Sequence, residues 1–182
     1  MKPSPALRFL SHQVWAVHPP VFESLAALLE SHANGDRAAA IAAPAAPDGE
    51  PAPTIIGTTA VVPVRGIIAR YADQINGACQ DAGRSAESLQ RDLLTLAADP
   101  RVQRIVLRID SPGGTVAGTS ETGDTIRRVS AGGKPITAFV DGMAASAAYW
   151  LASQCDEIVM AGPTSEVGSI GVITAHVDAT RA

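Results

Sequence analysis

The sequence predicts an α/β domain with a mostly parallel sheet and crossover helices. From residue 54 onward, short segments rich in β-branched residues alternate with segments of helical spacing, and this alternation is typical of βαβ crossovers. The composition is 46% hydrophobic but only 4% aromatic, so the core must be built from Ala, Val, Ile and Leu. With 182 residues, the chain is long enough for one sizeable core and an extension.

The chain is expected to have three parts. Residues 1–37 form an N-terminal helical extension, because residues 21–30 place apolar side chains at helical spacing behind Pro19 and Pro20. Residues 38–53 are biased toward Ala and Pro and are expected to form a linker. Residues 54–182 form the main domain.

Within the main domain the expected elements follow one another in a regular order. Leu89, Leu93 and Leu96 define a helix that Asp99 and Pro100 end, whereas Gly118 and Gly123 weaken the next one. Strands are expected at 59–64, 105–109, 136–140, 157–161 and 170–174, and helices at 84–98, 115–130 and 144–153.

Charge and composition exclude several classes of function. The net charge is −4 and the basic residues are scattered, which argues against nucleic acid as a partner. No apolar run is long enough to span a membrane, and residues 1–15 lack the apolar core of a secretory signal, so a cytoplasmic location is expected. Cys79 and Cys155 fit neither a disulfide framework nor a metal site.

Two segments carry residues suited to catalysis. Asp110-Ser111-Pro112-Gly113-Gly114 follows a buried strand, and its glycines leave backbone N–H groups free to form an oxyanion hole. A structural Pro-Gly-Gly turn is the alternative.

The second segment, residues 141–150, leads from a strand through Gly142 into a helix of small side chains. Ser146 is expected in the first turn of that helix, where N–H groups favour a developing negative charge. The alternative is that Ser146 is a small residue at a tight packing contact.

A third segment, GSIGV at 168–172, completes a pattern with DSPGG at 110–114 and DGMAASAAYWLAS at 141–153. Together these resemble the signature segments of the signal peptide peptidase A family of serine peptidases. GSIGVITAH and the PVRGII segment at 63–68 are similar to its phage branch, the lambda-type capsid-assembly proteases. The resemblance implies a Clp/crotonase-like fold and a serine endopeptidase with a Ser–Lys dyad.

The resemblance also implies residue roles. Ser146 matches the nucleophile, while Gly114 and the backbone N–H of Ala147 match the oxyanion hole. The family's base lysine lies several dozen residues after the serine, but the only lysines here are Lys2 and Lys134. Lys134 precedes the serine and is expected to be a solvated loop residue, with catalysis as the less favoured alternative.

The missing lysine leaves three explanations open: the chain is a fragment, it is a decayed prophage remnant, or another residue is the base. His176, thirty positions after Ser146 and close to Asp178, is the best candidate for such a base. Asp110 and Asp141 each precede a glycine turn and are expected to bond backbone two residues on.

The resemblance implies phage scaffold, portal or coat proteins as substrates, a homo-oligomer, and a location in the host cytoplasm or the prohead. No cofactor and no metal are expected, because the glycine pairs match no nucleotide-binding fingerprint and no ligand spacing occurs. Two rival functions remain: a catalytically incomplete head-assembly or scaffold-associated protein with the same fold, and acyl-CoA chemistry, since crotonases share the oxyanion-hole architecture.

Overall fold

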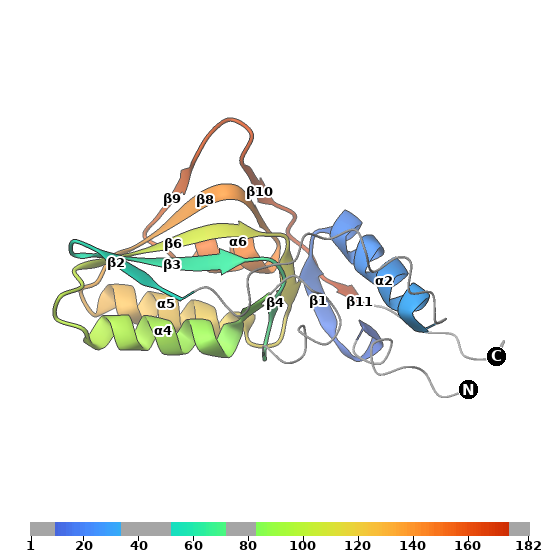
Figure 1. Cartoon of the computed structure of the whole chain (residues 1–182), viewed down its shortest axis with the longest axis horizontal. Coiled ribbons are helices and arrows are strands. Elements are labelled where there is room, and N and C mark those ends of the chain that lie inside the picture. Colours follow the sequence, from blue (N-terminus) through green and yellow to red (C-terminus); the bar gives the residue numbers. More distant parts are fainter. Residues whose placement is uncertain (1–9, 34–51, 72–82, 175–182) are drawn as a thin grey trace.

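The structure is a computed structural model that describes residues 10–33, 52–71 and 83–174. These residues form two sheets, with helices on one face of the larger sheet (Figure 1). None of the described helices is long and apolar enough to cross a membrane. His176 and Asp178, Cys79 and nearly all of the predicted linker lie outside the described residues.

The larger sheet has six strands in the described part of the chain, in the order β10-β8-β6-β3-β2, with β9 also paired to β8. Every pairing is parallel except that of β2 with β3. The predicted α/β class with a mostly parallel sheet and crossover helices is therefore confirmed. The strands are β2 (Thr54–Ile56), β3 (Thr59–Arg65), β6 (Arg104–Ser111), β8 (Ile136–Ala145), β9 (Glu157–Met160) and β10 (Glu166–Gly168).

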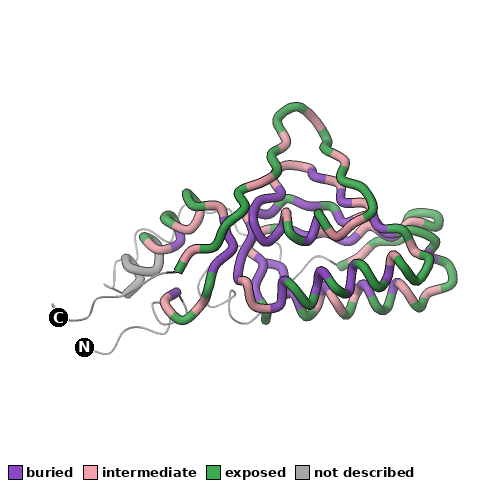
Figure 2. The backbone as a smooth tube through the Cα atoms, turned by 180° about the vertical axis from the view of Figure 1, so that it is seen from behind, coloured by how far each residue is buried: buried purple, intermediate pink, exposed green. Residues whose placement is uncertain are grey.

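The main core lies between this sheet and three helices, α4 (Ala86–Ala98), α5 (Thr119–Ala131) and α6 (Ala147–Ala152). Alternate residues of the central strands are buried, and Figure 2 shows the inner side of the helices buried as well. Leu89 and Leu93 of α4 are completely buried, and each contributes about 1.5–3 kcal/mol by leaving water. The core is aliphatic, as the composition predicts.

The smaller sheet has the order β11-β1-β7-β4-β5, and four of its strands, β1, β4, β5 and β7, were not expected from the sequence. β1 runs antiparallel to both of its neighbours, β7 and β11. Trp15 is buried in a second cluster with Leu10, Val17 and Leu25, so the N-terminal extension packs on this sheet. The bounds are β1 (Val14–Val17), β4 (Ile68–Ala69), β5 (Arg84–Ser85), β7 (Gly113–Thr115) and β11 (Ile173–Thr174).

Most predicted elements are confirmed, including the N-terminal helix, which is α2 (Pro19–Ala33). Helix α4 begins two residues later than expected because Arg84 and Ser85 form β5, and Ser85 then caps the helix by accepting a hydrogen bond from the Ser88 N–H (3.2 Å). Helix α5 begins only at Thr119, after Gly118 in a left-handed conformation (φ 89°).

Three expectations near the motifs are wrong. The predicted turn at 110–114 contains the end of β6 and the start of β7, because Gly113 and Gly114 pair with other strands. Residues 144–145 belong to β8 rather than to a helix. Residues 170–172 are not a strand, since β11 begins at Ile173. The division into three domains stays a prediction.

The first testable prediction concerns Gly114, which pairs with Ala16 on one side and with Ile68 on the other. A Cβ at this position would lie 1.7 Å from the Ile68 carbonyl oxygen, and this backbone contact cannot relax without separating β7 from β4. We expect Gly114→Ala to lower the free energy of unfolding by roughly 3 kcal/mol or more in denaturant titrations. The control is Gly162→Ala, where an added Cβ meets nothing within 4 Å; an equal loss in both variants would contradict the argument.

Candidate active site

Ser146 stands at the junction between β8 and α6, one residue before the helix begins. It was expected inside the first helical turn, but its φ of 52° and ψ of −111° place it outside the helix, in a positive-φ conformation that residues other than glycine rarely adopt. Such a conformation costs a non-glycine residue about 1–3 kcal/mol, and strain of this kind concentrates at functional sites. A serine on a sharp strand-to-helix turn is also the arrangement that presents the nucleophile in α/β-hydrolases.

An irregularity in the pairing of β6 with β8 sets the position of this junction. Ile109 pairs with Val140 but Ser111 pairs with Ala144, so residues 141–143 bulge opposite Asp110 alone. The Asp110 carboxylate accepts a hydrogen bond from the Met143 N–H (3.2 Å). It also fills the space above Gly142, where a Cβ would lie 2.4 Å from Asp110 Oδ1. A bulge re-aims the strand that follows it, and here that strand leads directly to Ser146.

Both aspartates have a structural role, although their partners differ from those expected. Neither bonds to backbone two residues on: Asp110 bonds to the neighbouring strand, and Asp141 accepts a hydrogen bond from Arg108 Nε (2.7 Å). Arg108 also forms an ion pair with Asp141. These contacts tie β6 to β8 on both sides of the bulge.

The structure brings the two predicted motif segments together through Gly113. Gly113 has a φ of 101°, and a Cβ there would lie 2.8 Å from the Ala145 carbonyl oxygen and 3.0 Å from the Ala147 nitrogen. The Gly113 N–H donates to Ser111 Oγ (3.2 Å), which in turn donates to the Gly66 carbonyl (2.7 Å). Gly114, the residue matched to the oxyanion hole, lies one position further along within the ladder of β7. Sequence spacing alone could not show that Gly113 is the glycine that lies against Ala147.

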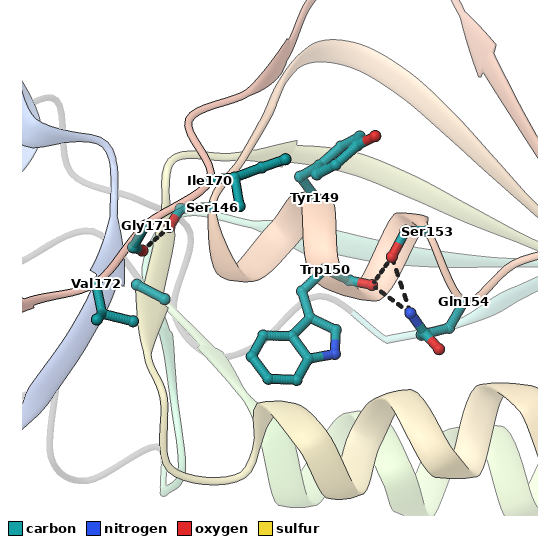
Figure 3. Close-up of a pocket in the computed structure, with 9 residues that line it drawn as sticks. Ser146, Tyr149, Trp150, Ser153, Gln154, Ile170, Gly171 and Val172 are labelled. Atoms are coloured by element: carbon teal, nitrogen blue, oxygen red, sulfur yellow. Dashed lines mark hydrogen bonds between the residues drawn. The ribbon is translucent and has the colours of Figure 1, made fainter.

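Ser146 is largely buried at 6% exposure, and its partners come from the 168–171 segment. Its N–H donates to the Gly168 carbonyl (2.8 Å) and its Oγ donates to the Gly171 carbonyl (3.1 Å). Figure 3 shows the serine facing Gly171, with the Trp150 indole in the same pocket. In the described residues the hydroxyl is therefore held by a carbonyl rather than by a base.

The pocket beside Ser146 has a volume of about 440 Å³ (Figure 3). Its walls are mainly apolar and come from α6, from residues 170–172 and from β1. Its lining residues are Ala16, Ser146, Tyr149, Trp150, Ser153, Gln154, Ile170, Gly171 and Val172.

A second cavity has a similar volume of about 440 Å³. It is lined by His18, Met143, Ala145, Met160, Ser165, Glu166, Val167, Gly168 and Ser169. The two cavities share no lining residue, and the neighbours Ala145 and Ser146 at the strand-to-helix junction line one cavity each.

The alternative bases are not brought to Ser146 in the described part of the chain. Lys134 precedes β8 and Ser146 follows it, so the two lie at opposite ends of a ten-residue strand. Lys134 Nζ donates to the Leu96 carbonyl (3.1 Å) at the C-terminal end of α4, a helix-capping contact. His176 lies outside the described residues. Within the described ranges no group of His, Cys, Asp and Glu could hold a metal ion.

Cys155, three residues after α6, is the other nucleophilic side chain near this region. Burial, and to a smaller degree the nearby Asp156 carboxylate, raise the pKa of its thiol to about 12. The thiol contacts the Leu151 carbonyl (3.6 Å). Cys155 is therefore a packing residue.

Solved structures with a similar arrangement include crotonase-type and protease chains. One is an enoyl-CoA hydratase/isomerase family member, with 22% identity, a TM-score of 0.45, and coverage of 60% of this chain and 46% of that chain. Another is the 1510-N membrane-bound stomatin-specific protease in complex with a substrate peptide, with 19% identity, a TM-score of 0.47, and coverage of 64% and 51%.

Residues 128–182 match the family described as Peptidase family S49. "Protease 4" of Salmonella typhi is 42% identical over 41% of this chain and 12% of the relative. "Head-tail preconnector protein GP5" of Enterobacteria phage P21 is 35% identical over 68% and 24%. "Capsid assembly protease C" of Escherichia phage lambda is 42% identical over 44% and 18%. The predicted resemblance to this peptidase family and to its phage branch is confirmed. The chain spans about a quarter or less of each of these relatives.

A second testable prediction concerns the Asp110 contact with the bulge. Asp110→Ala removes the acceptor of the Met143 N–H, whereas Asp110→Asn keeps an oxygen at that place. We expect backbone amides 143–146 to exchange with deuterium faster in the alanine variant but not in the asparagine variant. Unfolding free energy should fall by only about 1 kcal/mol in the alanine variant. Equal exchange in the wild type and the alanine variant would show that the bulge holds without the carboxylate.

A third prediction concerns Cys155. Because burial raises its pKa to about 12 from an ordinary value of 9.0, its thiolate population at pH 8 should be about a thousandfold below that of an exposed thiol. We expect alkylation of Cys155 by iodoacetamide, followed by peptide mass spectrometry, to be slow in the folded chain and to accelerate in denaturant. Fast alkylation in the native protein would show that the thiol is accessible and reactive.

Proposed function

We propose that this chain carries the nucleophile of a serine endopeptidase that cuts scaffold, portal or coat proteins during phage head assembly. The proposal is supported by the three motif segments, by the S49 match over residues 128–182 and by relatives that include a capsid assembly protease. The observation that carries it is the backbone of Ser146: a strained serine at a strand-to-helix junction, directly before the Ala147 N–H.

The proposed reaction is hydrolysis through an acyl-enzyme. Ser146 Oγ attacks the scissile carbonyl carbon while its proton passes to a base, and the carbonyl oxygen becomes negatively charged. The N–H of Ala147 and that of Gly114, the donor that the resemblance implies, stabilise this charge. The C–N bond then breaks, the base returns the proton to the leaving amine, and water hydrolyses the acyl-enzyme.

The base in this proposal is a lysine of a Ser–Lys dyad. A lysine amine can accept the serine proton if burial lowers its pKa. Because Lys134 caps α4, we propose that the lysine comes from a longer protein or from a neighbouring subunit, with His176 as the alternative base. In either case the Ser146 hydroxyl must turn away from the Gly171 carbonyl before it can react.

A homo-oligomer in the host cytoplasm or the prohead is part of the proposal. Apolar side chains remain exposed around the Ser146 pocket: Ile170 is 84% exposed, Val172 62% and Trp150 40%. Contiguous apolar surface of this kind is typical of contacts with another chain. A substrate segment or a neighbouring subunit would cover it.

The fourth prediction tests the nucleophile by fluorophosphonate labelling of the folded chain. If a base reaches Ser146, we expect labelling that Ser146→Ala abolishes by at least about a hundredfold. The matched control is Ser153→Ala, since Ser153 lines the same pocket but donates its hydroxyl to the Trp150 carbonyl within an ordinary helix end. Labelling should survive in this control.

The outcomes separate the remaining alternatives. Loss of labelling in an additional His176→Ala variant would identify the histidine as the base. A folded chain that takes no label would favour a catalytically incomplete head-assembly protein, or a chain that needs a lysine from elsewhere. Labelling that persists in Ser146→Ala would contradict the proposed nucleophile.

A further inference from the structure

The N-terminal strand β1 occupies the space between the two segments that flank Ser146. On one side β1 pairs with β7, and on the other with β11, which follows Gly171 and Val172. Both pairings are antiparallel, and Figure 1 shows β1 and β11 side by side next to α2. The strand edges nearest to the serine are therefore filled by the chain's own N-terminal residues.

The backbone of β1 also reaches the catalytic junction. Ala16 lines the pocket that contains Ser146. A Cβ on Gly113 would lie 2.3 Å from the Ala16 carbonyl oxygen and 3.0 Å from the Ala147 nitrogen. A peptide carbonyl of β1 and the proposed oxyanion donor therefore converge on one point beside the nucleophile. That is the place where the carbonyl of a cleavable peptide must lie.

Few interactions keep β1 in place. The strand has four residues, three of them paired with β7 and two with β11. Its main anchor is Trp15, which is completely buried, lies 5.9 Å from the Phe22 ring centroid and donates its indole N–H to the Leu10 carbonyl (3.0 Å). An extended peptide that adds to a sheet edge makes the same backbone bonds as β1.

We propose that β1 occupies the binding cleft of an extended peptide, with Ala16 in the place of the substrate residue nearest to Ser146. A peptide substrate then competes with β1 for the edges of β7 and β11, and the N-terminal strand restrains the site until it is displaced. The inference rests on the proposed peptidase function for the nature of the ligand. The competition itself is a matter of binding and requires no catalysis.

The pairing pattern provides a way to lock β1 in place. His18 donates to the Pro112 carbonyl and Val116 donates to the Val14 carbonyl (2.8 and 2.9 Å), so even-numbered β1 residues bond toward β7. Val14 and Thr174, which face each other across β1 and β11, therefore form a non-hydrogen-bonded pair. Such pairs have the shorter Cα separation, which suits a disulfide. Val14 is also half exposed.

The fifth prediction measures binding of a fluorescein-labelled peptide that copies residues 11–18, SHQVWAVH. It is carried out in a Ser146→Ala, Cys79→Ser background, so that neither cleavage nor the Cys79 thiol interferes. The remaining native thiol, Cys155, has a pKa raised by burial. Fluorescence anisotropy is recorded for this parent, for Trp15→Ala, and for Val14→Cys/Thr174→Cys in reduced and oxidised forms. A tethered β1 acts as a competitor at about millimolar effective concentration, so the parent should bind the peptide weakly.

We expect Trp15→Ala, in which β1 is loosened, to bind the peptide at least about tenfold more tightly than the parent. The oxidised double-cysteine variant should bind at least about tenfold more weakly than its own reduced form. Val14→Ala, a change on the exposed side of the same strand, is the matched control and should bind like the parent. If Trp15→Ala does not fold, the oxidised and reduced forms still decide the question within one protein.

Equal binding by the oxidised and reduced forms, or no binding in any variant, would overturn the inference and make β1 a permanent wall of the site. The result is independent of the labelling experiment. If β1 competes with the peptide in a chain that takes no fluorophosphonate, the result supports the proposed peptide-binding cleft but not the peptidase function. If the chain is labelled but β1 does not compete, the result supports the peptidase function but not the proposed role of β1.

Discussion

The close approach of backbones at Gly113 and Gly114 is the constraint on which the rest of the structure depends. At these two residues β7 lies against β1, β4 and the junction after β8, and neither position has space for a Cβ. Pro112 separates the end of β6 in the larger sheet from β7 in the smaller one. The two sheets therefore meet at this step, and the candidate site lies at their meeting point.

The position of Ser146 follows from this meeting point and from the bulge in β8. Ser111 pairs with Ala144 only because three residues of β8 are accommodated opposite Asp110. That register carries Ala145 and Ala147 to Gly113 and leaves the serine between them with a positive φ. The strain is offset by the surrounding packing, since Ala144, Ala147 and Ala148 are completely buried. Small side chains around the serine are thus required by geometry as well as by access for a ligand.

The N-terminal strand β1 lies beside the candidate site. Composition suggests an extension separated from the domain by an Ala/Pro-rich linker, yet Trp15 and Ala16 lie within the smaller sheet and beside the serine pocket. Segments from both ends of the described chain, β1 and β11, therefore lie beside the pocket of the candidate nucleophile, Ser146. If β1 restrains the site as proposed, access to Ser146 depends on the pairing of residues 14–17 with β7 and β11.

The sequence by itself determined the alternation of strands and helices, the aliphatic core, and the three glycine-containing segments that mark Ser146 as the candidate nucleophile. These features depend on local periodicity and local composition, which a sequence displays directly. It did not reveal β1, because the apolar residues of VWAV are too few to show a period and become a strand only between β7 and β11. Only the tertiary structure decided that Gly113 rather than Gly114 lies against Ala147 and that Asp110 bonds across to Met143. It also decided that Ser146 stands outside its helix. Each of these depends on backbones distant in sequence meeting at one point, where the space left for a Cβ selects the residue and its conformation.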